Sequence, residues 1–443
     1  MELGHAHATR PSLTRGCSFV AVQPPPANRR FLTTTVSMRF NQRFPSDRHP
    51  LVLVINSGSS SLKFALVTPE GGEIVVSGLA ERLNSPDALL EIKSAEGSKE
   101  SYAIPTAGHA EALDEMLRHL SSYHIDAVGH RVVNGGEKFN ASILLDDDSE
   151  AAIAACSDIA PVHAPANALG IHVARKKFPE LPQVAVFDTA FHQSIPEHAF
   201  RYGVPDEWYE THRVRKYGFH GTSHWFVSTQ AAALLRKSPE ELQVLTAHLG
   251  NGSSVCAIRE GKSVDTSMGF TPLEGLVMGT RCGDIDANVL PFIQQRTGLP
   301  LSEIIDILNK KSGLLGISGI SSDMRTLLAA EASGNEKAHL AVEIFCYKLA
   351  RNLLALTAAL DRVDALIFTG GIGENSSVVR HRTLDHLRIL GPVLDPELNA
   401  SNGASATDIR GRISTVDSRL LVLVVPTNEE LVIARETANL LHS

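Results

Sequence analysis

Three short segments rich in glycine, serine and asparagine have the composition of phosphate-binding loops. They read VINSGSSSLK at residues 54–63, HLGNGSS at 248–254 and TGGIGEN at 369–375, and each is joined to an apolar run of strand length. Because glycine lacks a Cβ and serine is small, successive backbone N–H groups in such loops can approach phosphate oxygens and bind an anion. One loop of this kind is an ordinary turn in most proteins. Three of them after strands predict a single nucleotide site.

Two arginines lie among glycines and apolar residues. Arg131 lies in GHRVVNGG at residues 129–136, and Arg281 lies in MGTRCGD at residues 278–284. A guanidinium can hold a carboxylate or a phosphoryl group through two parallel hydrogen bonds, which a lysine cannot do. The alternative is a structural ion pair with a nearby acid such as Asp284 or Asp286, and both interpretations can hold together.

The remaining candidates for chemistry are Asp188, His220 and a pair of acids near the C-terminus. Asp188 follows an apolar run, and α/β proteins build their sites at the carboxyl ends of strands. His220 is one of 19 histidines and is singled out only by its glycine neighbours. Glu429 and the next residue follow a second apolar run. They either contribute carboxylates to the site or begin a helix that Thr427 or Asn428 caps.

The elements that must position these residues alternate between strands and helices. The strands predicted from apolar runs are 51–56, 64–67, 74–76, 127–130, 184–187, 244–247, 255–258, 365–369 and 420–425. Helical periodicity is found over 110–120 and, as an uninterrupted apolar stripe, over 337–360. The first three strands predict a meander of hairpins, and the later alternation predicts an α/β fold. Because the strand–loop–strand pattern recurs in both halves, we expect two related domains whose phosphate loops face each other across a cleft.

Length and composition narrow the class of protein. A chain of 443 residues exceeds the size at which one core stops growing, which favours two domains. Hydrophobic content of 43% and charged content of 20% are typical of a soluble globular protein, and the net charge of −8 argues against a nucleic-acid partner. No apolar run approaches the roughly 20 residues of a membrane helix, so we expect no membrane association. The five cysteines lack C-x-x-C spacing, which favours neither a disulfide framework nor a zinc site and fits a cytoplasmic location.

Residues 1–50 differ in composition from the rest of the chain. Seven arginines stand against two acids, with many hydroxyl residues and a run of three prolines. We expect this extension to be disordered. It resembles an organelle transit peptide, so import is one interpretation, and the other is a start assigned too early, with Met38 as the true start.

Four motifs occur together: NSGSSSLK at 56–63, HLGNG at 248–252, GTRCGD at 279–284 and TNEE at 427–430. On these motifs the chain resembles the acetate and propionate kinase family of the actin-like ATPase superfamily over residues 51–441. The resemblance implies two duplicated actin-like (ribonuclease H-like) domains with a nucleotide cleft between them. It assigns residues 51–188 and 428–443 to the first domain and residues 189–427 to the second.

The activity that the resemblance implies is reversible transfer of the γ-phosphoryl group of ATP to acetate by direct in-line displacement, giving acetyl phosphate and ADP. Mg²⁺, for which Mn²⁺ can substitute, would be positioned by Asn56 and Glu429. Asp188 matches the family's proton donor or acceptor. His220 and Arg281 would stabilise the transition state.

The resemblance also implies two sets of binding residues and a homodimer. The acetate-binding residues are Arg131 for the carboxylate and Val133, Phe219 and Pro272 for the methyl group. The ATP-binding residues are Lys63, His248, Leu249, Gly250, Asn251, Gly252, Asp323, Met324, Arg325, Gly371, Ile372, Gly373, Glu374 and Asn375. We expect the dimer to form through the second domain, because the helix over 337–360 is long and apolar on one side.

Physical chemistry qualifies the role of Asp188. A carboxylic acid with a pKa of roughly 4 to 5 is already ionised at neutral pH, so its attack on phosphorus needs no base. We therefore hypothesise that Asp188 orients Arg131 or the metal ligands. Asn134 and Ala164 replace the family's usual His and Asn, which leaves substrate preference open. The alternatives are a propionate or butyrate kinase, a pyrophosphate-dependent enzyme, and an actin-like ATPase without a carboxylate acceptor.

Overall fold

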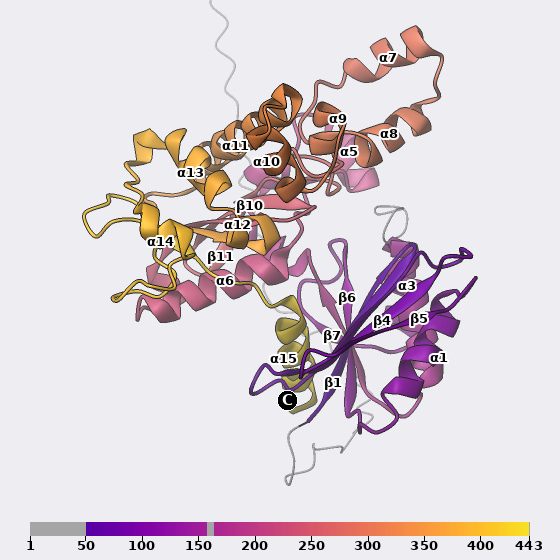
Figure 1. Cartoon of the computed structure of the whole chain (residues 1–443). Coiled ribbons are helices and arrows are strands. Elements are labelled where there is room, and N and C mark those ends of the chain that lie inside the picture. The colour runs from indigo at the N-terminus through magenta and orange to yellow at the C-terminus, as the bar shows by residue number, and fades with distance from the viewer. Residues whose placement is uncertain (1–49, 157–163, 443) are drawn as a thin grey trace, which may run out of the picture. The chain divides into compact units, whose positions relative to one another are not determined.

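A computed structural model describes residues 50–156 and 164–442. The extension predicted to be disordered lies, up to residue 49, outside the described residues. Two β-sheets with helices on both faces make up the described chain, as the α/β prediction requires (Figure 1).

The first sheet has the strand order β5-β4-β3-β2-β1-β6-β8-β7. Its strands are β1 Val52–Gly58, β2 Ser61–Val67, β3 Ile74–Glu81, β4 Leu89–Ser94, β5 Lys99–Ala103, β6 Ala127–Val132, β7 Ile143–Leu144 and β8 Gln183–Phe187. Strands β1 to β3 form the predicted antiparallel meander, which β4 and β5, not predicted, extend, whereas β1, β6 and β8 run parallel. The parallel strands bring their carboxyl ends to one edge of the sheet, where Asp188 follows β8.

Helices cover both faces of this sheet. Helices α1 (His109–His119) and α3 (Ala164–Lys177) pack on the face that carries Leu53 and Ile55, and α15 (Glu429–His442) packs on the opposite face (Figure 1). Helix α15 approaches β6 closely at Gly129, where a Cβ would lie 2.6 Å from the hydroxyl of Thr437. The C-terminal helix therefore belongs to the layer of the first sheet, and its first residue, Glu429, lies near that sheet.

The second sheet has the order β11-β10-β9-β12-β13. Its strands are β9 Gln243–Leu249, β10 Ser253–Arg259, β11 Lys262–Thr266, β12 Ala365–Thr369 and β13 Leu421–Val424. Helix α6 (Gly221–Leu234) packs on one face and α11 (Glu336–Leu356) on the other (Figure 1). One core cluster joins α6 and α15 to apolar residues of both sheets, so these two helices connect the halves of the described chain.

The helix predicted over 337–360 is observed as α11, which ends four residues earlier and is followed by a short 3₁₀ turn, η4 (Thr357–Ala359). Its apolar stripe, including Ala341, Phe345, Leu349 and Leu353, is buried in the core of its own chain. The stripe is covered by packing against the second sheet, so it does not itself support a dimer interface. A dimer through the second domain stays a prediction.

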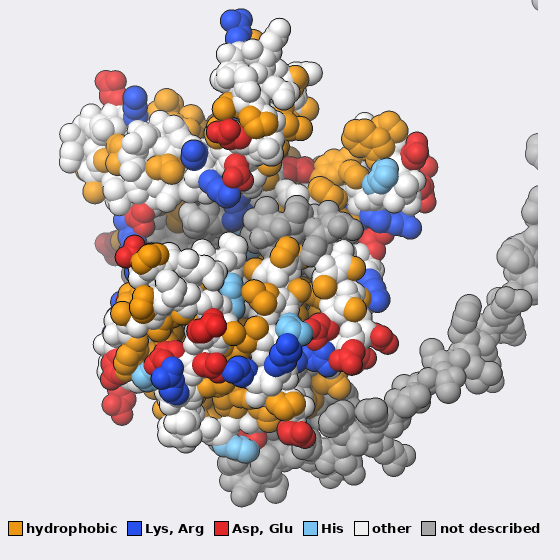
Figure 2. Space-filling view, turned by 90° about the vertical axis from the view of Figure 1, so that its right-hand side faces the viewer, with side chains coloured by type: hydrophobic (Ala, Val, Ile, Leu, Met, Phe, Trp, Pro, Cys, Tyr) orange, Lys and Arg blue, Asp and Glu red, His pale blue; other side chains and the backbone are white. Residues whose placement is uncertain are grey.

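The other helices of the described chain are shorter. They are α2 Asp147–Ala155, α4 Glu197–Phe200, α5 Asp206–His212, α7 Val289–Thr297, α8 Leu301–Lys310, α9 Gly313–Ser318, α10 Met324–Ala332, α12 Gly370–Asn375, α13 Ser377–Asp385, α14 Pro396–Ala400, and the 3₁₀ turns η2 Ala190–Ser194, η3 Pro239–Glu241 and η5 Arg388–Leu390. In the described ranges no helix is both long and apolar enough to cross a membrane. On the face seen in Figure 2, acidic, basic and apolar side chains are interspersed, so the net negative charge is not gathered there into one area.

Candidate active site

A cavity of about 620 Å³ brings together three segments that are far apart in the sequence. They are the turn between β9 and β10, the start of α10, and α12. The predicted ATP-binding residues that line it are Gly250, Asn251, Asp323, Met324, Arg325, Gly371, Ile372 and Asn375. Ser322, Leu328 and Ser376 line it as well and were not predicted. The segments singled out for a nucleotide thus share one cavity of the size that small-molecule sites have.

Strand pairing explains why two of these segments meet. Strands β9 and β12 are parallel neighbours with Thr369 beside His248, so the chain leaves both strands at the same edge. Gly370 then turns with a φ of +76°, and a Cβ there would lie 2.8 Å from the carbonyl oxygen of Leu249. Only glycine fits this turn without strain. The segment 370–375, expected as a loop, is the short helix α12.

Asp323 and Arg325 interact with each other at the rim of the cavity. The carboxylate of Asp323 caps α10 by accepting hydrogen bonds from the backbone N–H groups of Arg325 and Thr326. The Arg325 guanidinium also donates to this carboxylate at 2.8 Å and, with the cap, lowers the pKa of Asp323 to about 2. Asp323 therefore stabilises the start of the helix that lines the cavity.

Several predicted ATP-binding residues lie outside the lining of this cavity. Leu249 and Gly373 are buried. The Glu374 carboxylate accepts hydrogen bonds from the backbone N–H groups of Gly370 and Thr427, at 2.9 and 3.1 Å. Glu374 thus has a structural role: it joins the turn after β12 to the segment that leads into α15. Lys63, on β2, forms an ion pair with Glu430 at the start of α15.

Arg131 and Asp188 form a two-pronged ion pair at the carboxyl edge of the first sheet. The Arg131 Nε and Nη2 atoms donate to the Asp188 carboxylate at 3.0 and 2.7 Å. Only 2% of the Asp188 side chain is exposed, against 19% for Arg131. Burial raises the pKa of Asp188, while the Arg131 guanidinium opposes this rise. Burial lowers the pKa of Arg131, but Asp188 and Glu429 together raise it by more, so Arg131 stays charged.

Arg281 and His220 converge on the turn between β9 and β10, which lines the 620 Å³ cavity. A Cβ on Gly252 would lie 3.2 Å from Arg281 Nη2 and 3.5 Å from His220 Nε2. The Arg281 Nη1 atom donates to the carbonyl oxygen of Pro272 at 2.8 Å. Within the described ranges no carboxylate pairs with Arg281, and Asp284 instead accepts from the backbone N–H of Gly275. The guanidinium of Arg281 is therefore available to an anion.

His220 is held in an unusual conformation. Its φ of +57° lies in the left-handed region, which a non-glycine residue adopts rarely and most often at functional sites. Its ring stacks on that of His248 with 4.3 Å between centroids, and its Nδ1 lies 2.9 Å from the hydroxyl of Ser254. His248 in turn bonds the hydroxyl of Ser223. Burial lowers the pKa of His220 well below its usual value, so the ring is neutral at neutral pH.

Two of the three residues predicted to surround a methyl group lie in one small apolar cluster. Phe219 is buried there with Tyr217, Met268 and Met278, and Val133 packs against it. Pro272 is not among the residues of this cluster, and its carbonyl oxygen accepts a hydrogen bond from Arg281. Nothing in the sequence neighbourhood of the two methionines distinguishes them from ordinary core residues.

The donor set proposed for Mg²⁺ fits that ion. Asn56 lies opposite Lys63 in the β1–β2 ladder, and Lys63 reaches the start of α15, where Glu429 lies. The Glu429 carboxylate accepts from the Thr222 hydroxyl at 3.1 Å and lies 3.6 Å from Arg131. Among the described residues no cluster of three or more histidine, cysteine or acidic side chains could hold a metal alone. Mg²⁺ commonly uses one or two protein oxygens and takes its other ligands from water and phosphate, which agrees with an amide and one carboxylate.

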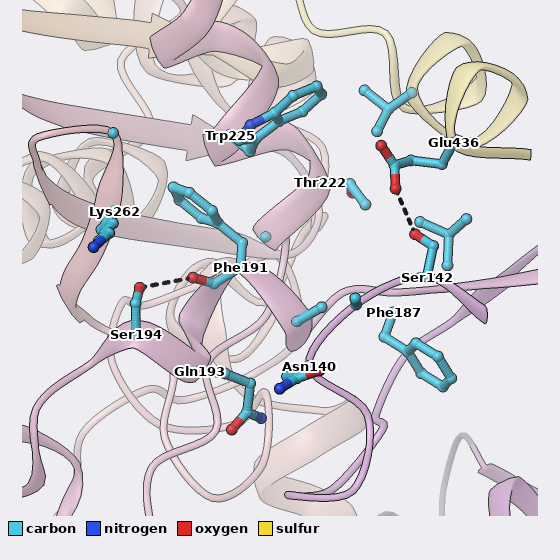
Figure 3. Close-up of a pocket in the computed structure, with 16 residues that line it drawn as sticks. Asn140, Ser142, Phe187, Phe191, Gln193, Ser194, Thr222, Trp225, Lys262 and Glu436 are labelled. Atoms are coloured by element: carbon cyan, nitrogen blue, oxygen red, sulfur yellow. Dashed lines mark hydrogen bonds between the residues drawn. The ribbon is translucent and has the colours of Figure 1, made fainter. Parts of the chain in front are cut away.

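A second cavity, of about 590 Å³, lies on the other side of the start of α6 (Figure 3). Trp225, Phe191 and Lys262 line it on one side, and Ser142 and Glu436, which hydrogen bond at 2.8 Å, on the other. None of the predicted site residues lines it. Thr222 lines this cavity and also donates a hydrogen bond to Glu429.

Comparison with known proteins identifies the family. A model of the acetokinase family matches residues 51–435. The chain belongs to the acetokinase family. It is 53% identical over 393 residues to the acetate kinase of Stutzerimonas stutzeri (strain A1501), covering 88% of this chain and 98% of that protein.

Solved structures of relatives agree with this family assignment. A propionate kinase from Francisella tularensis subsp. tularensis SCHU S4 is 42% identical with a TM-score of 0.83, covering 88% of this chain and 99% of that chain. The acetate kinase of Porphyromonas gingivalis is 40% identical with a TM-score of 0.82, covering 88% and 100%. The two-sheet, actin-like α/β architecture expected for an acetokinase is confirmed.

Proposed function

We propose that the protein is an acetate kinase, which reversibly transfers the γ-phosphoryl group of ATP to acetate and forms acetyl phosphate and ADP. Membership of the acetokinase family and relatives named acetate kinase at about 50% identity support this activity. The observation that carries the proposal is the turn between β9 and β10. Gly250 and Asn251 of this turn line the nucleotide cavity, and Gly252 touches Arg281 and His220.

In the proposed reaction an ionised acetate oxygen attacks the γ-phosphorus as the bond to the bridging oxygen of ADP breaks. Arg131 holds the carboxylate, and Asp188 keeps its guanidinium in place. Arg281 and His220 face the transferring phosphoryl group and stabilise its charge. An arginine in such a position contributes about 10³ to 10⁵ in rate in related transfers, and the neutral His220 ring adds a hydrogen-bond donor. Mg²⁺ held by Asn56 and Glu429 supplies further neutralisation of the phosphates when bound.

Acetate is the proposed acceptor because Val133, Phe219 and Pro272 match the positions that line the methyl pocket of the family. One methylene in such a pocket changes the free energy of binding by only ~1–3 kcal/mol, so propionate is expected to be a slower substrate. The relative solved as a propionate kinase keeps that acid as the second candidate. An actin-like ATPase without an acceptor is disfavoured, because it would need neither Arg131 nor Arg281 for a carboxylate substrate.

Further proposals rest on the family resemblance alone. They are Mg²⁺ as the metal with Mn²⁺ as a substitute, a homodimer, a cytoplasmic location, and the division into a first domain of residues 51–188 with 428–443 and a second of 189–427. The packing of α15 against β1, β6 and β8 supports the assignment of the C-terminal helix to the first domain. Light scattering of the purified protein tests the dimer, and a monomer at working concentration would remove that proposal.

Trapping of acyl phosphate by hydroxylamine tests the activity and the acceptor together. Acetate, propionate and butyrate are compared in parallel with MgATP. We expect the highest hydroxamate yield from acetate, its loss in Arg281→Ala, and its retention in Arg296→Ala, a matched change at an exposed arginine of α7. ATP hydrolysis that ignores all three acids would support the ATPase instead.

A further inference from the structure

A buried row of hydrogen bonds runs from His220 into the second sheet. The Nδ1 of His220 lies 2.9 Å from the hydroxyl of Ser254, which lies 2.8 Å from Nε2 of His224. The Nδ1 of His224 lies 2.7 Å from the hydroxyl of Thr246. Ser254, His224 and Thr246 are fully buried. We call these three residues the His220 support.

The tautomers of His220 and His224 depend on each other, because both rings contact the Ser254 hydroxyl. A neutral imidazole donates from one nitrogen and accepts at the other, and a hydroxyl has one hydrogen to give. The Ser254 hydroxyl contacts two imidazole nitrogens and can donate to only one of them. If it accepted from both rings, its buried hydrogen would have no acceptor among the hydrogen bonds of the described residues, which is costly, so it donates to one ring and accepts from the other. Burial lowers the pKa of both His220 and His224 well below the usual value, so both rings are neutral. The row therefore has only two arrangements, which run in opposite directions.

The far end of the row favours one direction. If Thr246 donates to His224, the hydrogen bonds of the row lie between 2.7 and 2.9 Å. In the reverse direction the Thr246 hydroxyl must donate to the carbonyl oxygen of Cys256 at 3.4 Å, beyond the usual range for this bond. The first direction makes Ser254 donate to His220 Nδ1. It therefore leaves the hydrogen of His220 on Nε2.

A second histidine shows that the fold can fix the hydrogen on a given nitrogen. The Nε2 of His192 faces the carbonyl oxygen of Phe219 at 2.9 Å, so it must carry the hydrogen, and its Nδ1 accepts from Ser263 at 2.8 Å. In the described part of the chain, no carbonyl oxygen is hydrogen bonded to Nε2 of His220. Its Nε2 faces Gly252 and the region of Arg281, where the proposed function places the transferring phosphoryl group. Phosphoryl oxygens accept hydrogen bonds, so they require the same arrangement that Thr246 favours.

We propose that Ser254, His224 and Thr246 are positioning residues that hold His220 as the neutral tautomer with its hydrogen on Nε2, aimed at the transferring phosphoryl group. The inference rests on the proposed function for the identity of the group that His220 meets. In the opposite tautomer His220 would turn a lone pair toward phosphoryl oxygens and repel them. Removing one preorganised donor of this kind costs about 10²- to 10³-fold in kcat.

Ser254→Ala tests the support, and Ser263→Ala is its matched control. Both serines are fully buried and both contact a buried histidine, but Ser263 lies outside the row. We expect Ser254→Ala to lower kcat by about 10²-fold with KM for acetate and ATP changed only a few-fold. Ser263→Ala should keep kcat within about twofold, as most substitutions away from a site do. Equal kcat values in the two variants would overturn the proposal.

Nitrogen NMR of histidine-labelled wild-type protein reads the tautomer directly and does not depend on a variant that folds. The His220 signals are assigned by their loss in His220→Gln. With MgATP bound, we expect a neutral ring with its hydrogen on Nε2, and in Ser254→Ala a mixture of tautomers. A charged ring, or a hydrogen on Nδ1, in the wild-type complex would overturn the proposal. If no acetyl phosphate forms, the proposed function fails separately, because the tautomer is measured without turnover.

Discussion

At the scale of single residues, the Arg131–Asp188 pair allows a test of whether Asp188 orients Arg131 or transfers a proton. Asp188→Asn keeps an acceptor for Arg131 but removes the buried charge that holds the guanidinium. We expect kcat/KM for acetate to fall by roughly 30- to 700-fold, which corresponds to ~2–4 kcal/mol of lost transition-state stabilisation. Because acetate is already ionised, the dependence of kcat on pH should keep its shape from about pH 6 to about pH 9 in the variant.

Steady-state kinetics of wild type and Asp188→Asn over that pH range check this prediction. A limb in the wild-type profile that disappears in the variant would identify Asp188 as a proton donor or acceptor. Asp188→Ala is the harsher comparison, since it leaves the buried guanidinium of Arg131 without its bidentate partner.

Residue pairs were predicted unevenly. The hypothesis that Asp188 orients Arg131 agrees with their ion pair, which forms because Asp188 follows β8 and Arg131 lies on β6, its parallel neighbour. The alternative partners suggested from sequence, Asp284 and Asp286, do not pair with Arg131 among the described residues. The His220 support was missed, because Ser254 lies in a predicted loop motif and His224 in a helix, and only the fold brings them to one ring.

Elements were predicted better than contacts. Strand β12 has the predicted bounds, and the meander of β1 to β3 and the α/β alternation follow from apolar runs and turns, whereas β4 and β5 were not predicted. The segment 370–375 was expected as a loop, since its glycines are typical of turns, but packing against β9 holds it as α12. Glycine content predicts that another group can approach the backbone closely, but it does not decide whether the segment is a loop or a helix.

The junction between β12 and α12 gives a test at the scale of an element. Gly370 has a φ of +76° and meets the Leu249 carbonyl, whereas the Cβ of an alanine at Gly371 would meet nothing within 4 Å. We expect Gly370→Ala to lower the free energy of unfolding by about 1–3 kcal/mol. Gly371→Ala should change it by less than ~0.5 kcal/mol, because a surface change away from strain has little effect.

Thermal unfolding of the two variants side by side measures this difference. They carry the same substitution one residue apart in the same short helix, so helix propensity is matched between them. Equal melting temperatures would show that the turn relaxes to accept a side chain. The strain at Gly370 would then not be what selects glycine there.

Two buried neutral histidines, one in each half of the chain, make the stability of the whole molecule depend on pH. Burial lowers the pKa of His130 and of His192 to about 4. In the unfolded chain these imidazoles take up protons near pH 6.5, whereas in the folded chain they stay neutral down to about pH 4. The free energy of unfolding therefore falls as the pH falls from about 6.5 to about 4. Each group should remove about 2 kcal/mol between about pH 6.5 and about pH 5. Urea unfolding at the two pH values measures the loss, and His130→Gln should reduce it. An unchanged loss in that variant would assign it to other groups.

The residues proposed to hold the metal come from segments that lie far apart in sequence. The dependence of turnover on the metal therefore tests an arrangement that only the folded molecule provides. Asn56 leaves β1 and Glu429 begins α15, while the nucleotide cavity lies beside the second sheet. Removal of divalent ions by EDTA should abolish turnover, and Mg²⁺ or Mn²⁺ should restore it.

Glu429→Gln should raise the Mg²⁺ concentration for half-maximal activity by about tenfold or more, since a carboxylate binds this hard cation better than an amide. Glu430→Gln removes the same charge one residue away, from a side chain paired with Lys63, and should leave that concentration within about threefold. Equal shifts in both variants would mean that the charge at the start of α15, and no ligand there, sets the response to Mg²⁺.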